Sequence, residues 1–215
     1  MKIIIISATD FEIQEAFGKL QSTKNKEIKF YTTGVGMLAT AVNLCRIIYE
    51  EKPTLIIQAG IAGCFNTNEK LGKVYVVSKE FLGDLGVDEN NTWKDMFDLK
   101  FLSPNQKPFT KKSLMNKNIH QFNKIDAEII SAVTVNQIST NQEIIQQIQK
   151  KYSPTLESME GAALHYVGNS FQIPYIQIRS TSNYIGERNK VNWKIELAIK
   201  NLNTQLIKLV KKLEV

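Results

Sequence analysis

Two glutamates and a Ser-Asn pair are the side chains of this sequence best suited to chemistry on a small polar ligand. Glu12 follows the apolar run Lys2–Ser7, Glu160 opens the run Gly-Ala-Ala-Leu, and Ser182-Asn183 follows another apolar run. An ionised glutamate only accepts hydrogen bonds, so it can hold two vicinal ribose hydroxyls or take a proton from water. The simpler alternatives are that Glu160 complements a helix dipole and that Ser182 and Asn183 cap a helix or turn.

Glycine-rich segments allow a backbone to approach a ligand closely. The segment Gly-Ile-Ala-Gly at 60–63 follows an apolar strand, although small residues there equally allow a strand and a helix to pack together. Gly34-Val35-Gly36 lacks the third glycine of a dinucleotide fingerprint, and no Walker-type phosphate loop occurs. We therefore expect no nicotinamide cofactor. Two cysteines and two histidines without metal-site spacing predict no metal site.

The elements that must position these residues alternate between strand and helix. Apolar runs predict strands at 2–7, 28–33, 55–59, 73–82, 127–135 and 175–179. Helical patterns follow Thr9 or Asp10 and cover 37–51, 141–152, 160–171 and 193–213, whereas 83 to about 123 is predicted to be an extended surface excursion. This order predicts an α/β fold in one domain, 1–215, with a largely parallel sheet whose ligand lies beyond the carboxyl ends of the strands.

Charge and hydropathy exclude several classes of partner. The net charge of +6 comes from lysines dispersed along the chain or gathered at helix ends, without an aromatic-interleaved basic stripe, so we expect no nucleic-acid binding. The N-terminal run of isoleucines is too short for a secretory signal or a membrane span. We expect a cytoplasmic protein that does not bind membranes.

In combination, the motifs resemble a known family. Asp-Phe-Glu12, the glycine segment at 60–63, Glu-Ser-Met-Glu160-Gly-Ala-Ala and Arg-Ser-Thr-Ser-Asn183 occur in the order and approximate spacing of the nucleoside-phosphorylase superfamily. The most similar branch contains methylthioadenosine/S-adenosylhomocysteine nucleosidase and futalosine hydrolase. Gly-Asp-Leu-Gly at 83–86, Asn-Tyr-Ile-Gly at 183–186 and Trp193 look more like futalosine hydrolase. The resemblance covers nearly the whole chain and implies a three-layer α/β/α fold with a mixed, largely parallel sheet.

The resemblance also implies roles for individual residues. Glu12 matches the carboxylate that activates the attacking water, and Glu160 matches the carboxylate that binds the ribose hydroxyls. Ser182 and Asn183 match the pair at the purine. Further residues expected to bind the substrate are Gly60, Ile61 and Ala62 at the glycine segment, Met159 at the sugar face, Ile138 through its backbone at the purine, and Trp193 at the base or the 5′ substituent. Core packing is an equally weighted alternative for Trp193.

Asn183 stands where adenosine-type nucleosidases carry Asp. Asn is not a general acid, but its NH₂ donates to a 6-oxo group and its carbonyl accepts from N7–H, so a 6-oxopurine fits it better than adenine. Phosphorolysis needs an anion site, whereas Ile61 occupies the middle of the glycine segment and no arginine lies near Glu12 in sequence. Hydrolysis is therefore expected over phosphorolysis.

These considerations predict a purine-nucleoside N-glycosidase without a cofactor. It would hydrolyse futalosine to hypoxanthine and dehypoxanthine futalosine in menaquinone biosynthesis, with Arg188 and Lys190 as candidate cations for the substrate benzoate. The alternatives are a methylthioadenosine/S-adenosylhomocysteine nucleosidase, a purine nucleoside phosphorylase and a non-catalytic nucleoside-binding protein. A homo-oligomer, with a dimer as the default, is expected because symmetric dimers are the commonest oligomers.

Overall fold

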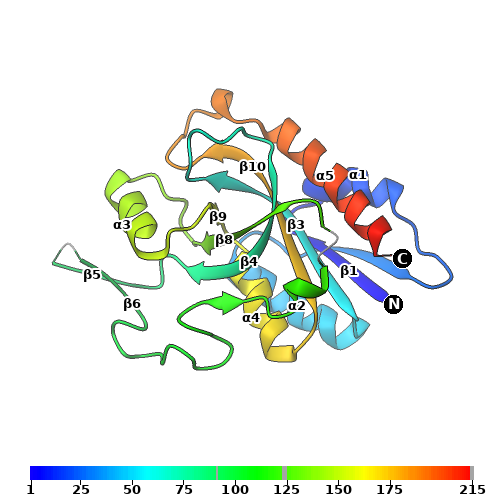
Figure 1. Ribbon diagram of the computed structural model, residues 1–215. Helices are drawn as coiled ribbons and strands as arrows, with labels where there is room; N and C mark the ends of the chain where they lie inside the picture. The colour runs from blue at the N-terminus through cyan, green and yellow to red at the C-terminus, as the bar shows by residue number, and fades with distance from the viewer. Residues whose placement is uncertain (91, 123–124, 214–215) are drawn as a thin grey trace.

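The computed structural model describes residues 1–90, 92–122 and 125–213 and has three layers, with helices on both faces of a mixed sheet (Figure 1). The strands within these ranges are β1 Lys2–Ser7, β2 Glu27–Thr32, β3 Leu55–Cys64, β4 Val74–Leu82, β5 Gly86–Glu89, β6 Thr92–Asp95, β7 Leu114–Met115, β8 Glu128–Thr134, β9 Leu156–Ser158 and β10 Tyr175–Tyr184. The helices are α1 Asp10–Lys19, α2 Met37–Glu51, α3 Gln142–Tyr152, α4 Gly161–Phe171 and α5 Ile195–Lys212, with short 3₁₀ turns at Ile119–Phe122 and Lys190–Asn192. The predicted fold class is confirmed.

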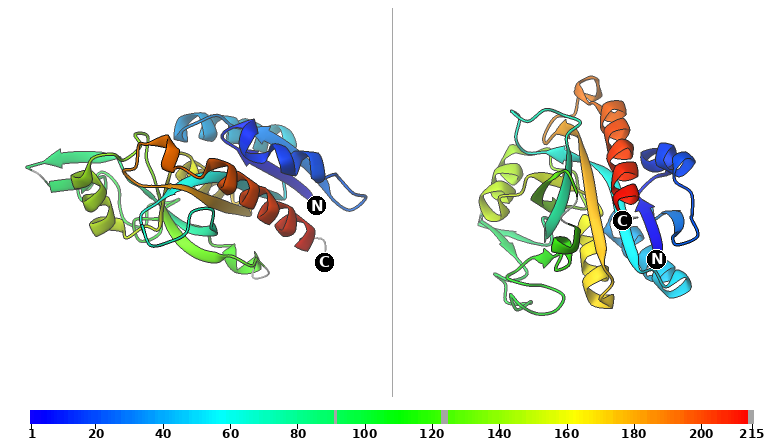
Figure 2. Two further views of the ribbon diagram at one scale, coloured as in Figure 1. Left: turned by 90° about the horizontal axis from the view of Figure 1, so that it is seen from above. Right: turned by 45° about the vertical axis from the view of Figure 1, so that its right-hand side comes forward.

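The isoleucines of β1 explain the three layers. Ile3 and Ile5 pack in one cluster with residues of α1 and α5, whereas Ile4 and Ile6 pack on the opposite face with residues of α2 and α4. All four are fully buried. A strand buried on both faces needs a continuous apolar run rather than an alternating one, which is the pattern of this segment. Figure 2 shows α1 and α5 lying together on one side of the sheet.

Strand pairing closes part of the sheet into a ring. β2, β1, β3 and β10 are parallel neighbours, and β10 then pairs antiparallel with β4. β4 pairs with β8, β8 pairs with β9, and β9 returns to pair antiparallel with β3. β3 is therefore flanked by β10 along its length and by β9 at its carboxyl end. The ring brings residues distant in sequence to the end of β3.

Several predicted boundaries are wrong, most of them because strand pairing extends or creates strands. Residues 60–63 were expected after the strand, but they continue β3 to Cys64, because β10 pairs with β3 along the whole segment. β10 likewise continues past Arg179 to Tyr184. Residues 157–160 do not open a helix: 157 and 158 lie in β9, and α4 begins at Gly161. The expected surface excursion contains the β5–β6 hairpin and β7, and α5 begins at Ile195 rather than Trp193.

A buried asparagine of α5 holds α1 in place. Asn203 is fully buried, and its side chain accepts from the Ala16 amide and donates to the Glu12 carbonyl, both at 2.8 Å. Those two backbone groups are four residues apart, which is the spacing of a helical backbone hydrogen bond. The α1 backbone at Glu12 is therefore fixed by a side chain from the last helix of the chain.

A buried carboxyl lies between β4 and the start of α4. Glu80 is fully buried and accepts hydrogen bonds from Gln177 Nε2 at 2.8 Å and Thr134 Oγ1 at 2.9 Å. The Thr134 hydroxyl also accepts from the Ala162 amide at 2.8 Å, in the first turn of α4. Burial raises the pKa of Glu80 to about 7, against opposing hydrogen bonds and the charge of Arg179. This network fixes the N-terminus of α4, where Glu160 lies.

No helix in the described ranges is long and apolar enough to cross a membrane.

We expect Asn203→Ala to lower the free energy of unfolding by about 1–3 kcal/mol, because its buried backbone partners lose their side-chain hydrogen bonds. Thr204→Ala, at the exposed neighbouring position, is the control and should change stability by about 0.5 kcal/mol or less. Urea denaturation measures both. Equal midpoints for the two variants would contradict the assignment.

Glu80 predicts a pH dependence of stability. Because the folded pKa of about 7 lies above the ordinary 4.5, the folded state binds the proton more tightly, and stability falls as pH rises from about 4.5 to 7. This shift corresponds to a fall of roughly 3 kcal/mol. Glu80→Gln should remove this part of the fall in the free energy of unfolding. Denaturation at pH 5 and at pH 8 measures the difference. Glu128→Gln, on the exposed start of β8, is the control; an unchanged slope in Glu80→Gln would contradict the prediction.

Candidate active site

A cavity of about 370 Å³ lies at the carboxyl ends of the strands, as the topology requires. Segments that follow β1, belong to β3 and β10, or lie between β9 and α4 form its walls. Of the residues predicted to form the site, the cavity lining includes Glu12, Ile61, Ala62, Ile138, Met159, Glu160, Ser182, Asn183 and Trp193. Gly60 lies behind this lining, beneath the side chain of Arg179.

Glu12 is held by the backbone on both of its oxygens. Its side chain is 6% exposed and lies in the first turn of α1, where it completes a capping box with Thr9. Oε1 accepts from the Ile61 amide at 3.0 Å, and Oε2 accepts from the Thr9 amide at 3.1 Å. Thr9 thus serves both to begin the helix and to orient the carboxylate.

Glu160 is held across the cavity by a different pair of groups. It lies at the N-cap of α4 and is 5% exposed. Oε1 accepts from the Gly36 amide at 3.1 Å, and Oε2 forms an ion pair with Arg179 Nη1 at 3.3 Å. Its carboxylate is therefore directed away from the helix it caps, toward Gly36 at the start of α2 and Arg179 of β10. The helix-dipole alternative does not account for these two contacts.

Arg179 joins the two carboxylates into one buried cluster. Its guanidinium also donates to the Ile61 carbonyl at 3.3 Å and, through Nη2, to Gln58 Oε1 at 3.2 Å. A Cβ on residue 60 would collide with the guanidinium and approach Glu12 Oε1 to 3.1 Å. Glycine at 60 thus allows the close approach of these two protein groups.

The electrostatics of the cluster act most clearly on Glu12. Burial raises the pKa of Glu12 above its ordinary 4.5. The positive charge of Arg179 and the amides of Ile61 and Thr9 act in the opposite direction, and the charge of Glu160 adds to the rise. A carboxyl with a raised pKa is a stronger base when ionised, which is what abstraction of a proton from water requires.

Ser182 and Asn183 are oriented by each other. The Ser182 hydroxyl donates to Asn183 Oδ1 at 2.8 Å, and Asn183 Nδ2 donates to the Tyr184 carbonyl at 3.0 Å. One amide hydrogen and one lone pair of Asn183 remain for a ligand. Asn183 pairs with Gly63 of β3, two residues beyond Ile61 along that strand.

The remaining predicted residues form the walls and the mouth. Met159 is half-buried, and Ile138 is 41% exposed in the loop after β8. Trp193 donates from Nε1 to the Glu187 carbonyl at 3.0 Å, and its ring lies 5.5 Å from the guanidinium of Arg188, which also lines the cavity. Lys190, the other proposed cation, is exposed outside the lining.

Sequence reasoning missed two charged residues of this region. No arginine lies near Glu12 in sequence, as stated above, but Arg179 reaches the cluster in space from β10. The sequence signal that could have found Arg179 is the alternation of polar residues, Gln177 and Arg179, within an otherwise apolar strand. Glu157, a second missed residue, lines the cavity from β9 and is 5% exposed. Nothing in its sequence neighbourhood predicts that it lies on the same face of the sheet as Asn183. The ring of strands brings the two residues to that face.

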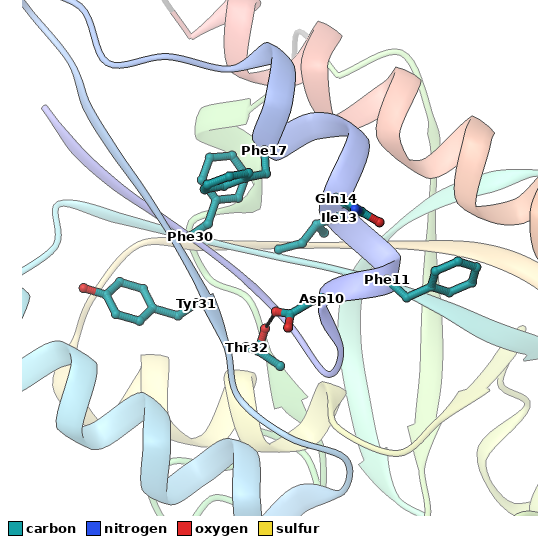
Figure 3. A pocket seen from close by; sticks show the side chains of 8 residues that line it. All are labelled: Asp10, Phe11, Ile13, Gln14, Phe17, Phe30, Tyr31 and Thr32. Carbon is teal, nitrogen blue, oxygen red and sulfur yellow. Dashed lines mark hydrogen bonds between the residues drawn. The ribbon is translucent and has the colours of Figure 1, made fainter.

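A second cavity, of about 440 Å³, lies between α1 and β2. Figure 3 shows aromatic side chains around it, including Phe17 and Phe30, with the Asp10 carboxylate and the Thr32 hydroxyl bonded to each other. It contains none of the buried carboxylates described above. The residues predicted to carry the chemistry therefore line the smaller of the two cavities.

Comparisons with known proteins found relatives along most of the chain. The sequence profile described as the phosphorylase superfamily matches residues 3–213. The 5′-methylthioadenosine/S-adenosylhomocysteine nucleosidase of Maridesulfovibrio salexigens is 28% identical, over 87% of each chain. The futalosine hydrolase of Thermus thermophilus is 22% identical, over 87% of this chain and 83% of that protein.

A solved structure, the native futalosine hydrolase of Helicobacter pylori, has the same fold. Its TM-score is 0.81 at 16% identity, over 99% of this chain and 98% of that one. With a match along nearly its entire length, the chain belongs to the phosphorylase superfamily.

Proposed function

We propose that this chain is a nucleosidase that hydrolyses the N-glycosidic bond of a 6-oxopurine nucleoside, with futalosine as the expected substrate. The observation that carries the proposal is the buried cluster of Glu12, Glu160 and Arg179, which lies in the same cavity region as Asn183. Nucleosidases and a futalosine hydrolase among the relatives support the same class of reaction.

The two ends of the cavity suit the two halves of a nucleoside. Glu12 is bonded to the Ile61 amide, whereas Asn183 pairs with Gly63, two residues further along β3. Two residues of a strand span roughly 6–7 Å, about the separation between a ribose ring and the far part of its base. The sugar would lie between Glu12 and Glu160, with its base directed toward Asn183.

The charges favour hydrolysis. Cleavage builds positive charge on the ribose, and two carboxylates against one guanidinium leave a net negative charge to stabilise it. A phosphate nucleophile would be repelled by the same charge. Among the described residues of the cavity lining, Arg188 carries the one positive side chain, and it lies at the mouth beside Trp193.

In the proposed reaction, Glu12 takes a proton from the water that attacks the anomeric carbon, while Glu160 accepts hydrogen bonds from the ribose hydroxyls. Asn183 stabilises the departing purine through the 6-oxo group and N7. The proton for N7 comes from water, because an amide has none to give. Met159 and Trp193 bound the sugar and the 5′ substituent, and Arg188 is placed to meet a carboxylate on that substituent.

The main alternative is a methylthioadenosine/S-adenosylhomocysteine nucleosidase, which the nucleosidase of M. salexigens favours through its higher identity. Asn183 is the observation against it, since adenine N7 and its amino group match an acid such as Asp better.

A homo-oligomer remains part of the proposal. The exposed apolar residues Leu38, Val42 and Tyr49 of α2 give a surface that a second copy would cover.

Purine release from futalosine, inosine and methylthioadenosine, each with and without phosphate, tests the proposal. We expect hypoxanthine from futalosine without phosphate, measured by chromatography, and methylthioadenosine left intact. Preferential release of adenine would contradict the substrate class, and an absolute requirement for phosphate would contradict hydrolysis.

Glu12→Gln should lower kcat by on the order of 10²–10⁴ with little change in KM, because it removes the base and keeps the shape of the side chain. In the unmodified protein, kcat/KM should rise with pH, and the midpoint of this rise should lie above pH 4.5. The reason is that only ionised Glu12 acts as a base and its pKa is raised. Glu15→Gln, on the exposed face of α1, is the control. Equal kcat for both variants would exclude Glu12 as the base.

A further inference from the structure

The carboxylate of Glu157 has one oxygen without a partner and lies in the cavity wall. The residue is 5% exposed, and its Oε1 accepts from the Ser139 amide at 3.0 Å. Oε2 is buried and makes no hydrogen bond within the described protein. A buried acceptor left unpaired is costly, and a donor on a ligand in the cavity would remove that cost.

The sheet register places Glu157 opposite Asn183. Both residues pair with Gly63 of β3, Asn183 from β10 on one side and Glu157 from β9 on the other. Paired residues on neighbouring strands direct their side chains to the same face, so these two side chains stand on one face, roughly 10 Å apart across two strand spacings. They line the same cavity.

Between them, Gly63 gives room to the side chain of Ile185. A Cβ at this position would lie 3.5 Å from Asn183 Nδ2 and would collide with Ile185, which also lines the cavity. Ile185 therefore lies over Gly63, and the register places Asn183 on one side of it and Glu157, with its unpaired oxygen, on the other. A flat ring that offers polar groups on two edges fits this arrangement.

We infer that Glu157 accepts a hydrogen bond from N1–H of a 6-oxopurine and so determines specificity for the base. This inference rests on the proposed function and adds a second determinant to Asn183. In a 6-oxopurine, N1–H lies on one side of the 6-oxo group and N7 on the other, so Asn183 and Glu157 contact opposite sides. In adenine, N1 is an acceptor, and its lone pair would face the carboxylate oxygen.

The surroundings of Glu157 are consistent with an acceptor that awaits its donor. Burial raises the pKa of its carboxyl, against hydrogen bonds from Ser139, and the charge of Asp84 adds to the rise. An N–H group from a ligand would favour the ionised form. A purely structural role, holding the Ser139 loop through Oε1, needs only one of the two oxygens and predicts no effect on the choice of base.

Binding of free bases to the full chain tests the inference independently of turnover. Calorimetry would compare hypoxanthine, 1-methylhypoxanthine and adenine. We expect the unmodified protein to bind hypoxanthine about 10- to 100-fold more tightly than either of the other bases. Equal affinity for hypoxanthine and 1-methylhypoxanthine would overturn the inference, and this measurement requires no variant to fold.

Glu157→Gln separates hydrogen bonding from steric effects of the methyl group. Its amide can still accept from Ser139 through one atom, while an NH₂ replaces the unpaired oxygen and suits an acceptor at N1. We expect the ratio of hypoxanthine to adenine affinity to fall at least tenfold. Glu187→Gln is the matched control, because that carboxylate lines the same cavity but both its oxygens already have partners, Asn189 and Asn192. A ratio that is the same in both variants would overturn the inference.

Glu157→Ala provides a second variant if the amide disturbs folding, and it should reduce the penalty for 1-methylhypoxanthine because it removes the carboxylate and makes room for the methyl group. Different results would contradict the proposed nucleosidase activity and the role of Glu157 in base selectivity. Purine release with no effect of Glu157 on the choice of base leaves the nucleosidase standing and removes the inference. Base selectivity that depends on Glu157, without hydrolysis of any nucleoside, keeps the inference and removes the enzyme.

Discussion

The buried guanidinium of Arg179 is the constraint on which the site depends. It compensates Glu160 directly, and its charge opposes the rise in the pKa of Glu12. Removal of one partner from such a cluster leaves an uncompensated buried charge, which is far more costly than loss of a surface pair. Residue 60 must therefore remain without a side chain, and β10 must keep its register beside β3. The register of the sheet and the charge balance of the site therefore depend on the same residues.

Most polar groups around the cavity are oriented before any ligand arrives. The backbone amides of Thr9, Ile61 and Gly36 fix two carboxylates, and Asn203 fixes the helix that carries Glu12. Groups fixed in this way need not reorganise when charge develops on a substrate, and that is the usual source of electrostatic stabilisation in enzymes. The unpaired oxygen of Glu157 is a different case, because the protein leaves its partner to be supplied from outside.

Local patterns in the sequence predict the elements better than their pairings. The buried run of β1 and the helical pattern of α2 have the predicted bounds, because each follows from its own local run of residues. Glu12, Glu160 and Asn183 were expected in one site, and all three line the cavity, although their roles are still proposals. β9 was missed because three residues carry no period, and Arg179 and Glu157 because their positions depend on which strands become neighbours. Pairing partners come from tertiary contacts that no local window contains.

The central position of β10 also bears on the order in which the chain is made. β10 is the last strand in sequence, yet it lies between β3 and β4 and pairs with both. A nascent chain on the ribosome can form β1, β2 and β3 with their helices, but the gap beside β3 stays open until residue 184 has emerged. Until then an apolar strand edge is exposed to other chains. Assembly of the site and protection from aggregation are therefore completed by the same late segment.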